Sequence, residues 1–337
     1  MKRREFIAGL GSAVALPLAA RAQQAERMRR IGVLATGFSE GDPERELRYS
    51  VFTQALADLG WADGRNVRMD LRYGGGGDSN RIRALAQELV GLQPDIIVTH
   101  STVQTAAVQR ETRTIPIVFA YVSDPVASGI VPRLNQPGGN ITGFAAYEVS
   151  LGGKWLELLT EIAPGLKRAA IMFTPDNPAA LVMVPPFETA ARRIKVELIN
   201  APVHSDLEIE EAINTLGREP EGGLVAPGGF GDVVPGGFTF TRRALIISAA
   251  ARNNVPAVYS YSDFVRDGGL LSYGPDPVDI YRRAAPYVDR ILRGEKPGDL
   301  PVQLPTKFEM VVNRKAAKAL CLAVPPSIVL RATEVIE

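Results

Sequence analysis

The stretch DIIVTHSTVQTAAVQ (95–109) decides the fold of this 337-residue chain. It begins as an unbroken apolar run, passes through small hydroxyl-bearing residues and opens into a helical segment. A continuous apolar strand is typical of a parallel sheet that is covered on both faces. In such sheets, ligands bind where a strand passes into the next helix. Because this junction contains no glycine, it is not a glycine-rich phosphate loop.

Strands and helices alternate on both sides of this stretch. The pattern predicts the following strands up to residue 146: 29–37, 67–74, 95–100, 115–122 and 140–146. Amphipathic helices are predicted between them, the clearest at 79–94. The fold class is therefore α/β, with a parallel sheet flanked by helices.

A second set of strands and helices begins at the helix predicted over 152–165. We expect two lobes, each a parallel sheet flanked by helices, with the ligand cleft between them. The final third has no complete domain of its own and returns to finish both lobes. The expected boundaries are 28–145 plus about 273–300 for lobe 1, and 146–272 plus about 301–337 for lobe 2.

The first 22 residues form an export signal rather than part of the fold. A charged start is followed by about 14 apolar residues, fewer than the ~20 that span a bilayer, and by the small residues ARA (20–22). We expect cleavage near Ala22 and a periplasmic protein. Arg3 and Arg4 also resemble a twin-arginine signal, so both export routes stay open.

Composition excludes several classes of function. Removing residues 1–22, with four basic residues and one acidic residue, leaves 34 basic and 36 acidic residues, a net charge of −2. No basic face is evident, so nucleic acid is not an expected partner. The chain has one cysteine, Cys321, and two histidines, which allow no internal disulfide and no cysteine-based metal site. We expect no metal and no cofactor.

Several segments, taken in order, resemble a known family. They are PIVFAYVSDPVASGIV (116–131), GGNITGF (138–144), YSDFVRDGGLLSYGPD (261–276) and the closing segment 313–337. This order is similar to that of ABC transporter substrate-binding proteins, in the tryptophan-binding-protein-like group with a type I periplasmic-binding fold. The sequence departs from the family at Cys321 and at GGFGDVVPGG (228–237).

The resemblance implies an exported solute-binding protein that captures an amino acid or related carboxylate, aromatic ones included, by hinge closure. Its partners would be the small ligand and a membrane permease. Two alternatives remain: a ligand-sensing subunit for a membrane receptor, and an exported α/β enzyme. The chain contains no G-x-G-x-x-G after its first strand, no G-x-S-x-G and no H-E-x-x-H, so no enzyme is expected.

Ser101 and Thr102 are the first candidate ligand contacts, because they lie where the third strand meets its helix. Free N–H groups at a helix start attract a carboxylate, and hydroxyls add directed donors. Serine and threonine also cap helices without any ligand, and on this feature alone capping is the better interpretation. The export signal and the resemblance favour ligand binding. Tyr121, Ser123 and Asp124 end the next strand in the same way, with Asp124 either a cap or a ligand contact.

The second lobe supplies candidates that follow its own strands. They are Asp176, Asn177, Phe230, Asp232, Tyr261 and Tyr273. Asp232 or Asp124 would balance a ligand ammonium, and the tyrosines would form walls or stack on a ring. Turn chemistry explains Asp176 and Asn177 equally well.

Overall fold

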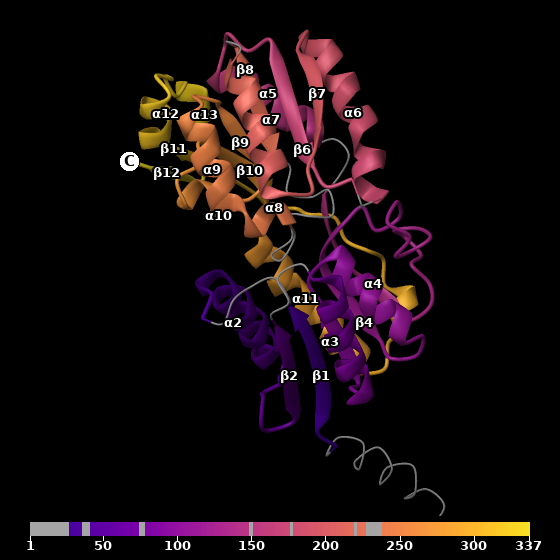
Figure 1. Cartoon of the computed structure of the whole chain (residues 1–337). Coiled ribbons are helices and arrows are strands. Elements are labelled where there is room, and N and C mark those ends of the chain that lie inside the picture. The colour runs from indigo at the N-terminus through magenta and orange to yellow at the C-terminus, as the bar shows by residue number, and fades with distance from the viewer. Residues whose placement is uncertain are drawn as a thin grey trace, which may run out of the picture.

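The computed structural model describes residues 27–35, 41–73, 78–147, 151–175, 178–218, 221–226 and 238–337. Its strands form two sheets, one in each of two lobes (Figure 1). Sheet A has the strand order β2-β1-β3-β4-β5, and sheet B has the order β12-β11-β10-β9-β8-β6-β7. We call sheet A with its helices lobe 1, and sheet B with its helices lobe 2.

Sheet A is parallel throughout. Its strands are β1 (Arg29–Ala35), β2 (Val67–Tyr73), β3 (Ile96–Thr99), β4 (Ile117–Ser123) and β5 (Ile141–Tyr147). Every residue of β3 and β4 is buried, as the unbroken apolar runs in the sequence predict. The helices of lobe 1 are α2 (Pro43–Asp58), α3 (Ser79–Gly91), α4 (Thr102–Glu111) and α11 (Pro277–Leu292).

Sheet B is parallel except at one pair of strands. Its strands are β6 (Arg168–Phe173), β7 (Glu197–Pro202), β8 (Gly222–Ala226), β9 (Ala257–Tyr259), β10 (Leu271–Pro275), β11 (Phe308–Asn313) and β12 (Glu334–Ile336). β11 runs antiparallel to β10, whereas the sequence predicts a parallel sheet. The reversal follows from the path of the chain, because it leaves sheet B after β10 and returns from lobe 1.

The helices of lobe 2 cover sheet B and frame its end facing lobe 1. They are α5 (Leu151–Ile162), α6 (Pro178–Ile194), α7 (Asp206–Arg218), α8 (Phe238–Thr241), α9 (Arg243–Arg252), α10 (Ser262–Arg266), α12 (Arg314–Ala319) and α13 (Pro326–Arg331). Among the described helices, none has the length and apolar character that a membrane span requires.

Helix α11 ties the two lobes together. It lies between two strands of sheet B in the sequence, yet it packs against α2 and β4 of lobe 1 (Figure 1). The Trp61 indole N–H donates to the Asp289 carboxylate at 2.8 Å and fixes the far end of α11 on lobe 1. After the 3-10 turn η1 (Pro297–Asp299), Gln303 extends the edge of sheet A, accepting from the Ala145 N–H at 2.8 Å. The lobe boundaries, with crossings near 145, 270 and 300, stay a proposal.

Gly274 in β10 provides a test of how closely the strands of sheet B approach. A Cβ atom at this position would lie 2.0 Å from the Ser260 carbonyl oxygen, which is backbone and cannot rotate away. We expect Gly274→Ala to lower the free energy of unfolding by at least ~2 kcal/mol, measured by urea denaturation. Gly91→Ala is the control, since a Cβ atom at that position would meet no other atom within 4 Å, and it should change stability by less than ~1 kcal/mol. Equal stability of both variants would contradict the prediction.

Candidate functional site

Four aromatic rings form a continuous row across the junction of the lobes. Tyr281 of α11 stacks on His100 with ring centroids 5.5 Å apart, and His100 stacks on Tyr121 at 5.7 Å. Tyr121 then stacks on Tyr261 of lobe 2 at 5.4 Å. The ring of Phe240 in α8 meets Tyr261 edge-on. The row brings together two predicted site residues, Tyr121 and Tyr261, from opposite lobes.

Tyr121 reaches this row through an irregularity in β4. Its φ of +67° lies in the left-handed region, which is uncommon for a residue with a side chain. The register between β4 and β5 shifts on both sides of Val122, so the strand bulges and Tyr121 changes direction. The Tyr121 hydroxyl donates to the Pro275 carbonyl at 3.1 Å, at the end of β10. This buried tyrosine therefore contacts both lobes.

A buried arginine lies beside the aromatic row. The Arg48 side chain in α2 is only 2% exposed. Its guanidinium lies 3.4 Å from the Glu44 carboxylate of the same helix and 3.5 Å from the Asp263 carboxylate of α10 in lobe 2. Burial lowers the pKa of Arg48, but the two carboxylates outweigh burial and hold that pKa above its ordinary value. Arg48 is therefore a permanent cation in the interior.

His100 is neutral in the folded protein. Burial first, and then the charge of Arg48, hold its pKa well below 6.5. The Tyr281 hydroxyl and the His100 Nδ1 atom are hydrogen-bonded at 2.6 Å. The His100 backbone N–H donates to the Gln104 side-chain oxygen at 3.1 Å. The Nδ1 atom and the backbone N–H of His100 are thus both hydrogen-bonded within the protein.

Helix α4 begins where the sequence predicts a helix. Ser101 is its N-cap, and the Ser101 hydroxyl accepts the Gln104 N–H at 3.4 Å. The Thr102 hydroxyl accepts the Ser123 N–H at 3.1 Å and so joins the start of α4 to the end of β4. Capping, one of the two alternatives for Ser101, is thus present, and ligand contact stays a prediction.

The Ser123 hydroxyl is the open polar group at this edge. Ser123 is 3% exposed, and its hydroxyl oxygen has no hydrogen-bond partner among the described residues. Its neighbour Asp124 accepts the Ala127 N–H at 2.9 Å and caps the following turn. A ligand contact by Asp124 therefore remains a prediction beside an observed capping role. An unpaired buried hydroxyl is costly, so contact of the Ser123 hydroxyl with a ligand stays a prediction.

Of the remaining predicted residues, Tyr273 lies in the described part of the chain. Tyr273 stacks on Phe308 of the neighbouring strand at 5.6 Å, within lobe 2, and is only half-buried. No contact of Tyr273 with the row of four rings is present in the described part of the chain. The others lie outside the described residues: Asp176, Asn177, Phe230 and Asp232.

Sequence reasoning missed Arg48 and Tyr281, the two residues that α2 and α11 contribute. A signal for Arg48 was present, because Arg48 precedes Phe52 and Leu56 by four and eight residues, on their face of α2. A charged residue on an apolar face needs a partner, and Glu44 lies one turn before it. No local signal marks Tyr281, since its partner His100 is 181 residues away.

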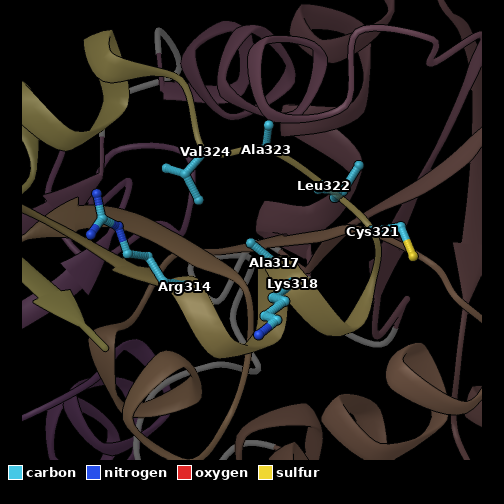
Figure 2. Close-up of a pocket in the computed structure, with 7 residues that line it drawn as sticks. All are labelled: Arg314, Ala317, Lys318, Cys321, Leu322, Ala323 and Val324. Carbon is cyan, nitrogen blue, oxygen red and sulfur yellow. The ribbon is translucent and has the colours of Figure 1, made fainter.

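A separate groove lies at α12 and the segment that follows it in lobe 2 (Figure 2). Its volume is about 480 Å³, and it is lined by Arg314, Ala317, Lys318, Cys321, Leu322, Ala323 and Val324. No group of three His, Cys, Asp or Glu side chains suited to a metal ion occurs in the described ranges. The groove shares no residue with the junction of the lobes.

Comparisons with known proteins agree with this architecture. Residues 33–336 match the family described as ABC transporter substrate binding protein. The tyrosine-binding protein of Clostridioides difficile is 26% identical over 269 residues, which is 80% of this chain and 75% of that protein.

Two solved structures have a TM-score of 0.80 with this chain. A conserved domain protein from Vibrio cholerae is 26% identical and covers 92% of this chain and 100% of its own. A Streptococcus pneumonia ABC domain in complex with L-Trp is 24% identical and covers 91% of this chain and 99% of its own. The likeness confirms the two-lobed periplasmic-binding fold that the sequence predicts.

His100 makes stability depend on pH below neutrality. The unfolded chain takes up a proton near pH 6.5, but the folded protein takes it up only at a much lower pH because the pKa of His100 is depressed. The free energy of unfolding should therefore fall as the pH drops below about 6.5, by up to ~1.4 kcal/mol per pH unit from this group. Urea denaturation between pH 5 and 7.5 measures this slope.

Two variants test whether the pH dependence of the free energy of unfolding comes from His100. His100→Phe keeps an aromatic ring in the row and removes the titrating group, so its stability should vary less with pH than that of the wild type. His204→Gln removes the other histidine, which lies half-exposed on lobe 2, and should retain the wild-type slope. An unchanged slope in His100→Phe would show that other groups are responsible.

Proposed function

The chain belongs to the family of ABC transporter substrate-binding proteins, and we propose that it captures an aromatic amino acid between its two lobes. The family comprises proteins that bind substrates, not a class of enzymes. The observation that carries the proposal is the buried Ser123 hydroxyl, which lacks a partner among the described residues and lies beside the start of α4. The relatives named for tyrosine and bound to L-Trp support an aromatic ligand.

The ligand carboxylate would bind at the start of α4. The first N–H groups of a helix point outward and carry a partial positive charge, which attracts a carboxylate. We propose that Ser101, Thr102 and Ser123 surround this carboxylate. Hydroxyls suit reversible capture because they donate hydrogen bonds without adding a fixed charge. The adjacent Arg48 is already paired with two carboxylates, which makes it a poor competitor for the ligand.

The ligand ring would lie beside Tyr121 and Tyr261. Both rings come from opposite lobes, so a ring that contacts both can do so only when the lobes are together. A ligand shifts the balance between open and closed lobes only through contacts that are better when closed. We propose Asp232 or Asp124 as the partner of the ligand ammonium. Asp176, Asn177, Phe230 and Tyr273 stay as further proposed contacts of lobe 2.

Closure would present a ligand-loaded surface to a membrane permease of an ABC transporter. We propose that residues 1–22 export the protein to the periplasm and are removed near Ala22. We also propose that the protein is not an enzyme and uses no cofactor. Incubation of the mature protein with each ligand, followed by chromatography, should return the ligand unchanged.

A thermal-shift screen of the mature protein tests the proposed ligand class. We expect L-tyrosine and L-tryptophan to raise the melting temperature, and sugars and nucleosides to leave it unchanged. At a ligand concentration 100-fold above the dissociation constant, binding should stabilise the fold by ~2.7 kcal/mol. The D-amino acids are the matched controls. A shift by sugars or nucleosides alone would refute the carboxylate proposal.

Ser123→Ala separates ligand binding from structure, because it should change affinity and stability in opposite directions. Removing the Ser123 hydroxyl should lower affinity for the carboxylate about tenfold, since a hydrogen bond to a charged group contributes ~1.5 kcal/mol or more. The ligand-free variant should be as stable as the wild type or more stable, because the hydroxyl lacks a partner among the described residues. Isothermal titration calorimetry and urea denaturation measure the two quantities.

Ser50→Ala is the control for this substitution. The exposed Ser50 hydroxyl bonds within its own helix to the Leu47 carbonyl, at 2.8 Å. Ser50→Ala should leave ligand affinity unchanged. If Ser123→Ala binds as tightly as Ser50→Ala, the Ser123 hydroxyl does not contact the ligand.

A further inference from the structure

We propose that four charged residues of α2 and α10 form a latch that holds the two lobes together and slows ligand release. The latch consists of Glu44 and Arg48 in lobe 1 and Asp263 and Arg266 in lobe 2. The proposal rests on the proposed function for its effect on ligand release, but its effect on the ligand-free protein stands independently.

The latch contains two ion pairs that cross between the lobes. Arg48 of α2 lies 3.5 Å from Asp263 of α10, and Arg266 of α10 lies 3.1 Å from Glu44 of α2. Each helix therefore supplies one cation and one anion. The Arg48–Glu44 pair within α2, at 3.4 Å, links the two crossing pairs into one network. Because both crossing pairs need α2 beside α10, neither survives separation of the lobes.

The two crossing pairs differ in their exposure to solvent. The side chains of Arg48 and Asp263 are 2% and 7% exposed, whereas those of Arg266 and Glu44 are 39% and 26% exposed. Charges attract more strongly in the interior, where water does not screen them. The inner pair should therefore supply most of the closing force, and the outer pair should respond to salt.

Arg48 has one ion-pair partner in its own lobe and one in the other lobe. Glu44 and Tyr281 belong to α2 and α11, which pack on one another within lobe 1 and move with Arg48. The Glu44 partner of Arg48 is therefore in place whether or not the lobes meet. Asp263 then meets a guanidinium that is already in place. Among the described residues, Arg48 is the ion-pair partner of Asp263, so opening removes that pair entirely.

The latch lies next to the proposed ligand site. Asp263 follows Tyr261 by two residues, and Tyr261 stacks on Tyr121 of lobe 1. The Arg48–Asp263 ion pair and the Tyr121–Tyr261 ring contact therefore form together when the lobes close. A ligand held between the lobes beside these rings would leave only after the pair has separated, which is why the latch should act on the dissociation rate.

Asp263→Asn tests the latch, because it removes the negative charge and keeps the shape of the side chain. In small-angle X-ray scattering, the ligand-free variant should have a larger radius of gyration than the wild type. With L-tyrosine as the probe, stopped-flow fluorescence should show dissociation about tenfold faster. Asp263→Glu retains the charge and should recover part of both properties.

Asp267→Asn is the matched control. Asp267 follows α10, four residues after Asp263, and pairs with Arg243 of α9 at 2.6 Å, wholly within lobe 2. This variant loses one ion pair as well, but none that crosses between the lobes. Its radius of gyration and dissociation rate should equal those of the wild type.

If circular dichroism shows that Asp263→Asn does not fold, Arg266→Gln tests the latch in its place. This partly exposed residue also pairs with Glu334 in its own lobe, so only its pair with Glu44 crosses. Arg266→Gln should enlarge the ligand-free protein to a smaller extent, and 0.5 M NaCl should reduce its difference from the wild type.

The experiments distinguish failure of the latch proposal from failure of the ligand proposal. If L-tyrosine does not bind the wild type, the ligand proposal fails, and scattering of the ligand-free variants still decides the latch. A radius of gyration equal to that of the wild type in every folded variant of Asp263 and Arg266 overturns the latch. An equal increase in Asp267→Asn overturns it too, because the effect would then follow from any lost charge on lobe 2.

Discussion

The buried guanidinium of Arg48 is the interaction on which the junction of the lobes depends. A cation removed from water is tolerated only where anions and hydrogen bonds replace its hydration. Glu44 supplies one anion from the same helix, and Asp263 supplies the other from the opposite lobe. The same charge helps to keep the neighbouring His100 neutral. One residue thus connects the position of α10, the protonation of the histidine and the contact between lobes.

The topology explains why these groups meet at one place. In a parallel sheet, the carboxyl ends of all strands lie along one edge. β3 leads to His100, β4 to Ser123, and β9 of the other sheet to Tyr261 and Asp263. Both sheets therefore direct their carboxyl ends toward the junction. Helix α11 also reaches the junction, because the chain leaves sheet B after β10 and α11 lies on lobe 1 (Figure 1). Its Tyr281 completes the row of rings.

The sequence predicted what is encoded locally and missed what arises over long distances. The buried strand β3 and the start of α4 at Ser101 follow from neighbouring residues, and the structure has both. Tyr121 was expected at the cleft, but its left-handed conformation and the bulge in β4 leave no trace in the sequence. Tyr281 was missed because its partner His100 is 181 residues away. Arg48 carried a local signal on the apolar face of α2, but its pairing with Asp263 of the other lobe left none. Tyr273 lies within β10 rather than after its end, and it stacks on Phe308 within lobe 2.

The balance of charge in the latch bears on the kind of ligand that we propose for the junction. Within the latch, Arg48 and Arg266 are matched by Glu44 and Asp263, so these four charges sum to zero, and Arg266 also pairs with Glu334 of its own lobe. A ligand with a net charge would leave one charge uncompensated in the closed, water-poor cleft, which is costly. A zwitterionic amino acid adds one positive and one negative group and preserves the balance. The neutral hydroxyls of Ser101, Thr102 and Ser123 and the neutral His100 are consistent with such a ligand, because none of them adds a charge of its own.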